Sequence, residues 1–288
     1  MTPDQYCQDK ASASGSSFYA SFRFLPELKR RAIIALYAFC REVDDVVDEC
    51  KDETVARQTL NWWRLEVSKL YQGEASHPVT LALQNLLGEF NLAEEYLQEI
   101  IDGMEMDLNI HSYASFKDLS LYCYRAASVV GLLSAEIFGF KNRDTLKYAH
   151  DLGMAFQLTN ILRDVREDAE RGRVYLPHDE LEQFGVTRQN LTQPITSDAV
   201  KALFQLQADR AREYYQKAFN ELPEEDRYSQ HIGLIMAEIY LSILKEIEND
   251  EFKVLEHRIK LTPTRKLWLA WRAARREKKR YKLFLKKP

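Results

Sequence analysis

Residues that interrupt regular secondary structure are scarce in this sequence. Its 288 residues include 10 glycines and 8 prolines, and no proline lies between Pro26 and Pro78 or between Pro78 and Pro177. A β-sandwich or β-barrel needs frequent turns, so this scarcity argues against both. Because 45% of the residues are hydrophobic and 29% are charged, the chain can fill a core and is not disordered. The composition therefore predicts a mostly helical globular protein.

Cysteines and long apolar runs are also few. The four cysteines, at positions 7, 40, 50 and 123, form no CxxC pair and no Cys/His ligand spacing, so we expect neither zinc nor disulfides. The longest strongly apolar uncharged run, 32–40, is about half of the roughly 20 residues that a spanning helix needs. The amino terminus lacks the layout of a signal peptide. These features predict a cytoplasmic protein with no membrane-spanning segment.

Apolar residues recur at helical spacing along most of the chain, and no convincing strand pattern is present. We predict helices over 3–13, 27–50, 54–71, 78–90, 93–111, 115–138, 142–170, 197–220 and 230–254, with a last helix from about 263. Residues 171–194 contain two glycines and two prolines and are expected to form a loop with short helical turns. No repeat or low-complexity linker divides the chain, so residues 1–288 are predicted to form a single all-α domain.

Charge is distributed unevenly along the chain. Eleven lysines and arginines and one glutamate occupy 265–288, so this basic C-terminal helix or tail carries a net charge of +10, whereas the whole chain carries −4. An intermittent apolar stripe lies among these cations: Leu267, Trp268, Trp271, Ala274, Tyr281 and Phe284. Such a helix favours peripheral contact with the inner face of an anionic membrane, whereas the acidic remainder disfavours nucleic acid. In the alternative, both tryptophans pack on the core and the end of the chain extends into solvent.

The predicted helix over 27–50 carries an unusual pair of acidic residues. Asp44 and Asp48 lie one turn apart on one face, about 6 Å along the axis, and Arg41 precedes them by one turn. Like charges at this spacing repel each other, yet no lysine follows until Lys51. A hard cation such as Mg²⁺ would offset the repulsion and keep waters for a phosphate-bearing substrate. A single pair of this kind is more often a solvated helix face, so the metal hypothesis needs a second cluster.

A second polar stripe lies on the predicted helix over 142–170. Gln157, Asn160, Asp164 and Asp168 share one face, and each offers an oxygen ligand. Apolar residues occupy the other sides, so this is a core helix whose polar stripe needs partners. Arginines lie near both clusters, namely Arg41, Arg163, Arg166, Arg171 and Arg173. Taken singly, each arginine is equally well explained by an intrahelical ion pair, such as Arg163 with Glu167.

Two acidic helices in an all-α protein suit the removal of diphosphate from an allylic carbon. Preorganised Mg²⁺ and arginines stabilise the leaving group, and an apolar aromatic cavity protects the carbocation from water. Two other classes stay open on the residues alone. A Mg²⁺-dependent phosphohydrolase also uses aspartates, but it typically needs a nucleophile or histidines near the metal, and the six histidines lie outside both clusters. The other alternative is a non-catalytic helical scaffold.

Three sequence blocks resemble those of the squalene and phytoene synthases, which are head-to-head prenyl transferases. The blocks are YAFCREVDDVVDE at 37–49, YCYRAASVVG at 122–131 and NILRDVREDAERGRVYLP at 160–177. SSFYASFRFLPE at 16–27 and GMEMDL at 103–108 also fit, so the resemblance covers most of the chain. Within the family, the first block is most similar to that of bacterial presqualene diphosphate synthases.

The resemblance implies an isoprenoid-synthase helical bundle with a central cavity and three Mg²⁺ ions between the acidic helices. Asp44 and Asp48 match the first metal motif, and Asn160, Asp164 and Asp168 match the second. The resemblance implies that Tyr122 steers the cation or the proton loss, alongside the four catalytic aspartates. It also implies substrate-binding roles for Ser17, Phe18, Tyr37, Arg41, Gln157, Arg163, Arg173, Tyr175, Tyr240 and Arg258.

The implied reaction condenses two farnesyl diphosphates to presqualene diphosphate for squalene or hopanoid biosynthesis. Phytoene, squalene and dehydrosqualene synthases are the alternatives within the family. NADPH is not expected, although the absence of a GxGxxG motif decides little because reductases of this family do not bind it that way. Many relatives have Val-Ala-Gly where this chain has Ala126, Ala127 and Ser128, beside the expected cavity, so the choice of product stays open.

Overall fold

The protein is built from α-helices. The structure, a computed structural model, describes residues 1–13, 21–50 and 52–286. Its α-helices are α1 (Pro3–Ala13), α3 (Glu27–Glu49), α4 (Glu53–Gln72), α5 (Pro78–Gln84), α6 (Glu94–Asn109), α7 (Phe116–Cys123), α8 (Val129–Phe138), α9 (Asp144–Glu170), α10 (His178–Gln183), α11 (Arg188–Thr192), α12 (Asp198–Glu221), α13 (His231–Asn249) and α14 (Pro263–Phe284). Three short segments are η1 (Phe22–Phe24), η2 (Tyr124–Ser128) and η3 (Lys253–Leu255). Within the described ranges no β-strand forms, which confirms the predicted fold class.

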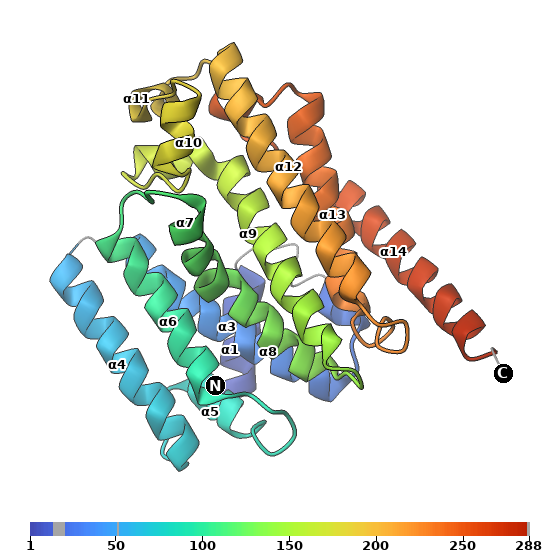
Figure 1. The fold of residues 1–288 in the computed structure, drawn as a ribbon. Coiled ribbons are helices and arrows are strands. Elements are labelled where there is room, and N and C mark those ends of the chain that lie inside the picture. The colour runs from blue at the N-terminus through green and yellow to red at the C-terminus, as the bar shows by residue number, and fades with distance from the viewer. Residues whose placement is uncertain (14–20, 51, 287–288) are drawn as a thin grey trace.

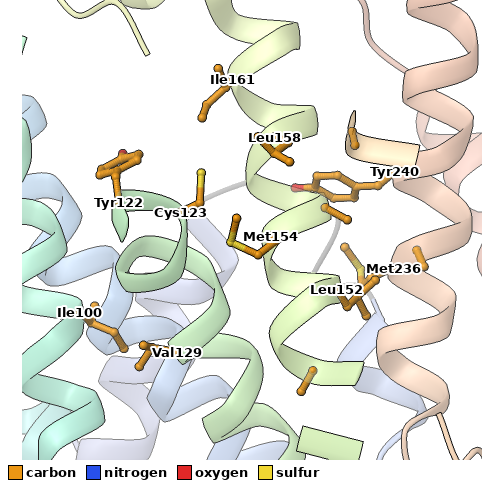
Figure 2. Close-up of a cluster of buried hydrophobic side chains, with 14 of the residues drawn as sticks. Ile100, Tyr122, Cys123, Val129, Leu152, Met154, Leu158, Ile161, Met236 and Tyr240 are labelled. Carbon is orange, nitrogen blue, oxygen red and sulfur yellow. The ribbon is translucent and has the colours of Figure 1, made fainter. Parts of the chain in front are cut away.

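Helix α9 is the central element of the bundle. It packs against α8, α12 and α13, while α3 and α6 pack against each other and against α8 (Figure 1). Figure 2 shows Met154 and Leu158 of α9 between Val129 on one side and Met236 of α13 on the other. Because α9 is enclosed in this way, polar side chains that project from it toward α3 lie inside the protein.

Most helix boundaries lie within two residues of the predicted ones, and the long loop contains only the short α10 and α11. The helix predicted over 78–90 ends early, at Gln84, where three-residue turns replace the helical hydrogen bonds and place Leu86 in the core. The helix predicted over 230–254 ends at Asn249. It stops there because Glu251 and Phe252 adopt left-handed backbone angles, φ 56° and 60°, which a right-handed helix cannot contain.

The stretch predicted as one helix over 115–138 is interrupted by a π-helical turn, η2. This wider turn lies directly against α9, where a Cβ atom on Gly153 would be 2.5 Å from the Cα of Ser128 and 2.8 Å from the carbonyl oxygen of Ala127. The Ser128 hydroxyl donates to the carbonyl oxygen of His150 at 2.9 Å. The π turn and the glycine therefore fit each other, and a side chain at position 153 would push α9 away from η2.

The combined segment 116–138 is long and apolar enough to cross a membrane by length and composition, which the sequence analysis did not anticipate. In the structure 50% of its most apolar window is buried inside the protein, where it packs between α6 and α9. Its apolar character is thus explained by packing in the core. All four cysteines are free, as expected.

Replacing Gly153 with alanine tests the close crossing of η2 and α9. We expect the free energy of unfolding to fall by about 1 to 3 kcal/mol, because the new methyl group meets backbone atoms that cannot move alone. Urea unfolding measures this difference. The matched control is Gly88→Ala, since a Cβ atom there meets nothing within 4 Å and its effect should stay within about 0.5 kcal/mol. Equal stability of the two variants would contradict the proposed crossing.

Candidate active site

A cavity of about 840 Å³ lies between α3, α6, α8, α9 and α13. Along α3 its lining changes from Ile33 and Leu36 to Asp44, and along α9 it changes from Leu152 to Asp164. The charged end is lined by Arg41, Asp44, Asp48, Asp107, Arg163, Asp164, Asp168, Arg171, Arg173, Arg258, Lys260 and Lys266. This volume is near the upper end of the usual range for ligand pockets, and the two-part lining fits ligands with an anionic head and an apolar chain.

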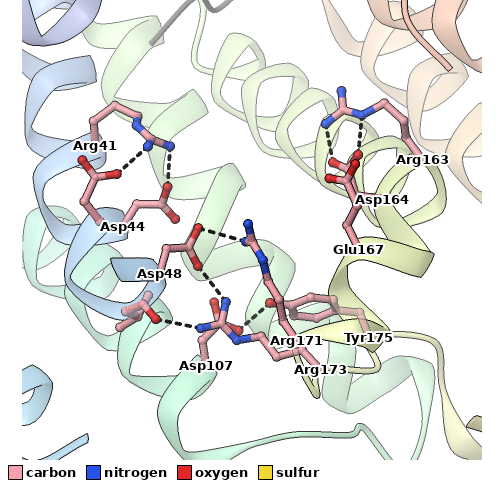
Figure 3. A network of polar contacts seen from close by, with 12 residues as sticks. Arg41, Asp44, Asp48, Asp107, Arg163, Asp164, Glu167, Arg171, Arg173 and Tyr175 are labelled. Atoms are coloured by element: carbon pink, nitrogen blue, oxygen red, sulfur yellow. Dashed lines mark hydrogen bonds and ion pairs between the residues drawn. The ribbon is translucent and has the colours of Figure 1, made fainter. Parts of the chain in front are cut away.

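The C-terminal half of α3 forms one side of the charged end. Arg41 Nη1 and Asp44 Oδ2 are 2.6 Å apart, and Asp48 accepts from Arg173 at 2.9 Å and from Arg171 at 3.5 Å (Figure 3). Burial, followed by the charge of Asp48, raises the pKa of Asp44 to about 6. A raised pKa of a carboxyl group means that the surroundings provide less positive charge than the ionised form needs.

Helix α9 forms the opposite side. Asp164 accepts from Arg163 Nε at 2.9 Å, and Arg258 Nη2 lies 3.2 Å from the same carboxylate. Asp168, one turn further on, has no such partner among the described residues. Burial, followed by the charge of Asp164, raises the pKa of Asp168 to about 7. The second acidic cluster therefore also contains more negative charge than its arginines compensate.

The loop after α9 connects the two sides. Val174 N donates to the carbonyl oxygen of His111 at 3.0 Å, which anchors this loop to the segment that follows α6. The anchor places Arg173 across the cavity, where its Nη2 atom donates to the carbonyl oxygen of Val47 on α3 at 2.9 Å. It also directs Tyr175 into the cavity (Figure 3). Arg171 and Arg173, which follow the second cluster in sequence, therefore contact Asp48 of the first cluster.

A buried carboxylate, Asp107 on α6, lies between the two clusters and orders two tyrosines. Tyr175 donates to one of its oxygens at 2.8 Å and Tyr122 donates to the other at 3.1 Å. The two rings stack at 4.9 Å, and Tyr113 stacks on Tyr175 at 6.1 Å. Burial raises the pKa of Asp107 to about 6, and burial followed by the charge of Asp107 raises the pKa of Tyr122 well above its usual value. Tyr122 is therefore a neutral phenol whose hydroxyl orientation is set by Asp107.

The site residues predicted from the sequence lie on this one cavity wherever the structure describes them. They are Tyr37, Arg41, Asp44, Asp48, Tyr122, Gln157, Asn160, Arg163, Asp164, Asp168, Arg173, Tyr175, Tyr240 and Arg258. Ser17 and Phe18 lie outside the described residues. The predicted cavity is therefore present, with the side chains of both acidic helices on its wall.

Two details of the arginines differ from expectation. The intrahelical pair of Arg163 with Glu167 is wrong, because Arg163 binds the adjacent Asp164 and Glu167 lies 3.0 Å from Arg258. Arg166 does not line the cavity, since its Nη1 atom donates to the carbonyl oxygen of Leu255 at 2.9 Å. Its Nε atom donates to Glu170, one turn further along α9, at 2.8 Å, so the intrahelical alternative is confirmed for this arginine. The partner of Glu167 is therefore Arg258, which is distant in sequence, and not Arg163.

The sequence analysis missed three charged residues of the cavity wall, Asp107, Lys260 and Lys266. The GMEMDL block at 103–108 contains Asp107 and was a usable signal, because Asp107 lies between the apolar Met106 and Leu108 and a buried aspartate needs a partner. The two lysines carry no local signal, since both lie in a segment that is rich in exposed cations.

The donor set of the charged end fits a hard divalent cation. The buried amide oxygen of Asn160 accepts no hydrogen bond in the described part of the chain, and the carboxylates around it exceed their arginine partners. Among the described residues no three His, Cys, Asp or Glu side chains gather into a group that could hold an ion alone. Mg²⁺ commonly binds through one or two carboxylates and takes its other ligands from water and substrate phosphates. The residues present therefore fit magnesium that arrives with a diphosphate.

Residues 11–265 match the family model of squalene/phytoene synthase. The chain belongs to the squalene/phytoene synthase family. A 15-cis-phytoene synthase from Synechococcus elongatus is 35% identical over 276 residues, which cover 91% of this chain and 89% of that protein. A presqualene diphosphate synthase from Rhodopseudomonas palustris is 39% identical over 234 residues, which cover 81% and 84% of the two chains.

The fold agrees with this assignment. The crystal structure of a dehydrosqualene synthase in complex with ligand is similar to this squalene/phytoene synthase with a TM-score of 0.84 at 27% identity, over 96% of this chain and 97% of that chain. The protein is therefore an isoprenoid-synthase bundle and a prenyltransferase-type enzyme of the head-to-head class.

Replacing Asp107 with asparagine tests its role as a positioning residue for the tyrosines. We expect kcat to fall about 100-fold with little change in KM, because the neutral amide no longer fixes both hydroxyls while the arginines of the charged end keep their own aspartate partners. Steady-state turnover of a prenyl diphosphate measures both constants. Tyr113→Phe is the matched control, since its buried hydroxyl has no partner among the described residues and its loss should leave kcat near the parental value. Equal kcat values for the two variants would show that Asp107 has no such role.

Proposed function

We propose that this enzyme joins two farnesyl diphosphates into presqualene diphosphate. In this reaction the C1–O bond of the first substrate breaks and diphosphate leaves. The double bond of the second substrate then attacks the C1 cation, and loss of one proton closes a cyclopropane ring. One diphosphate stays on the product, so the reaction releases one diphosphate and one proton and needs no reductant.

One observation carries the proposal. Asp44 and Asp48 on α3 and Asp164 and Asp168 on α9 line a single cavity whose wall becomes apolar one to two turns earlier along both helices. A substrate whose diphosphate lies between the two clusters would therefore extend its prenyl chain into the apolar part. The charged end stabilises negative charge where it develops in the transition state, which is the main requirement for ionisation.

The arginines and the magnesium divide the task of stabilising diphosphate. Mg²⁺ held by Asp44, Asp48, Asn160, Asp164 and Asp168 would neutralise phosphate charge as the C1–O bond breaks. Without metal and substrate, the guanidinium groups of Arg41, Arg163 and Arg173 pair with aspartates of this set. When metal takes their place at these aspartates, they can turn to phosphate oxygens.

The apolar part of the cavity protects the cation from water. Phe156 and Tyr240 line it with ring centroids 4.7 Å apart, and ring faces stabilise a desolvated cation by about 2 kcal/mol. Tyr122 lines the same cavity and contacts Asp107 of its charged end. Because its phenol is neutral and donates to Asp107, it can accept a proton only while passing its own to that carboxylate. Its immediate contribution is an oriented oxygen dipole that steers the cation.

Two observations favour presqualene diphosphate over the other products of the family. The Rhodopseudomonas palustris presqualene diphosphate synthase has a higher identity, 39%, than the 35% of the Synechococcus elongatus phytoene synthase, although over a shorter segment. The first acidic block also resembles the presqualene type. Phytoene synthase activity on geranylgeranyl diphosphate is the second candidate. NADPH is not expected to take part, and a cytoplasmic location on the inner face of the membrane stays a prediction.

Product analysis tests the proposal. The enzyme is incubated with Mg²⁺ and either farnesyl or geranylgeranyl diphosphate, each with and without NADPH, and the products are identified by mass spectrometry. We expect presqualene diphosphate from farnesyl diphosphate, unchanged by NADPH. Squalene or dehydrosqualene as the final product, or a C40 product made in preference, would overturn the assignment within the family.

The same incubation separates the rival classes. Release of phosphate without a new carbon–carbon bond would identify a phosphohydrolase. A helical scaffold would give no product, and Mg²⁺ with an inert bisphosphonate would leave its melting temperature unchanged. For the proposed enzyme these two ligands together raise the melting temperature by several degrees, because they bind only the folded state.

Asp48→Asn and Asp164→Asn test the two acidic clusters separately. We expect each variant to lose at least about 100-fold in kcat/KM, because one carboxylate of a magnesium site becomes a neutral amide. The melting temperature should stay near the parental value in the absence of metal. Glu42→Gln is the matched control, since Glu42 lies on the same helix but pairs with Lys10 and does not line the cavity. Near-parental activity of either test variant would contradict the metal assignment.

A further inference from the structure

Most of helix α14 lies beyond the residues that match the family model, which end at 265. It packs beside α13 at the edge of the bundle, and the C-terminus lies at its far end (Figure 1). The packed face is formed by Leu269, Ala270, Ala273 and Glu277, all of which are buried. The residues of the opposite face are not among those that this packing buries.

The opposite face of α14 exposes large apolar side chains. Leu267 is 62% exposed, Trp268 is 51% exposed and Trp271 is 52% exposed. The alternative in which both tryptophans pack on the core is therefore wrong. Arg272 lies over the ring of Trp268 at 4.5 Å, and Arg275 lies over that of Trp271 at 5.2 Å. At 100° per residue these side chains share one side of the helix, opposite to Ala270 and Ala273.

Two groups of cations on α14 differ in their partners. Arginines that point toward the bundle pair with its glutamates, as Arg265 does with Glu246 and Arg280 with Glu224. Four lysines form no ion pair with any described residue, namely Lys278, Lys279, Lys282 and Lys286. They follow the two tryptophans along the same outward side. The outer face of α14 thus carries an apolar section and then an uncompensated basic section.

We propose that this outer face, defined by Leu267, Trp268, Trp271, Lys278, Lys279 and Lys282, docks the enzyme on an anionic lipid bilayer. Indole rings favour the boundary between headgroups and acyl chains, and lysines favour the negative surface potential of anionic lipids. The position of the helix links docking to the cavity, because Lys266, one residue before Leu267, lines the cavity wall. Docking would hold the cavity close to the membrane into which prenyl substrates partition.

Charge favours a bilayer over the other occupants of such a face. In a two-fold dimer, the same surface of both copies forms the interface. The basic section, part of a segment of net charge +10, would therefore lie close to the basic section of the second copy, and the two would repel each other. A nucleic acid would meet an acidic body around the helix, since the whole chain is −4 despite this segment. A planar anionic membrane contacts the outer face alone.

Vesicle co-sedimentation of the full-length enzyme tests the proposal. Vesicles of phosphatidylcholine with phosphatidylglycerol are compared with vesicles of phosphatidylcholine alone. We expect the parent to bind only the anionic vesicles, and we expect added salt to weaken this binding. Two variants should each lower the partition coefficient at least about tenfold: Trp268→Ala/Trp271→Ala and Lys278→Gln/Lys279→Gln/Lys282→Gln. Activity on detergent-dispersed substrate should stay unchanged in both variants, which separates this proposal from the proposed reaction.

Matched controls come from other exposed helix faces. The control for the tryptophans is Trp62→Ala/Leu65→Ala on α4, where the two side chains are 42% and 64% exposed. The control for the lysines is Lys69→Gln/Lys117→Gln/Lys245→Gln, which removes three exposed lysines from other helices. Both controls should bind anionic vesicles like the parent. Parental binding by the tryptophan variant would overturn the proposal. Two further outcomes would overturn it. In the first, the parent does not bind vesicles but forms a dimer, and the tryptophan variant is monomeric. In the second, the parent binds duplex DNA and not vesicles.

Discussion

Repulsion among carboxylates that line one cavity is the constraint on which this structure depends. Asp44 and Asp48 on α3 and Asp164 and Asp168 on α9 come from distant parts of the chain and line one cavity. Burial and mutual repulsion raise the pKa of Asp44 to about 6 and that of Asp168 to about 7. The packing of α3, α8 and α9 around the apolar core holds these groups together although their charges favour separation. A site built in this way gains stability when a cation and a polyanion enter together.

The arginines of the charged end moderate this repulsion without removing it. Arg41 and Arg163 are local partners, whereas Arg173 reaches α3 only because its loop is anchored beside the segment after α6. Each can exchange a carboxylate for a phosphate oxygen, since a guanidinium group binds both in the same forked geometry. For the proposed reaction, the ion pairs of the free enzyme thus preorganise the groups that a diphosphate needs.

Sequence reasoning succeeded where a local pattern violated the expectation for its helix. Asp164 and Asp168 stood out because they belong to a polar stripe on a helix that also presents Phe156, Leu158 and Ile161, whereas a common cavity for both acidic pairs was implied only by the resemblance to the family. Asp107 is one of several acidic residues on α6, and its significance comes from Tyr122 of α7 and Tyr175 of the loop after α9. The π turn at 124–128 also escaped prediction, because its residues differ little from those of an ordinary helix and its partner is Gly153 of α9.

The amphipathic pattern of the last helix was visible in the sequence, but its orientation was not. The apolar stripe read from 267–284 contains residues of both faces, since Trp268 and Trp271 point outward while Tyr281 stacks on Tyr228 of the bundle at 4.2 Å. Only the docking of Ala270 and Ala273 on the bundle decides which side stays exposed.

The sequence by itself determined the helices, their approximate ends, the two acidic clusters and the basic C-terminal segment, because each of these is encoded in residues fewer than about four turns apart. The tertiary structure alone decided that the clusters face each other, that Arg173 crosses from one to the other, that Asp107 orders Tyr122 and Tyr175, and that the tryptophans of α14 face outward. Those features arise from contacts between segments tens of residues apart, and such contacts are set by the packing of whole helices, which no local spacing specifies.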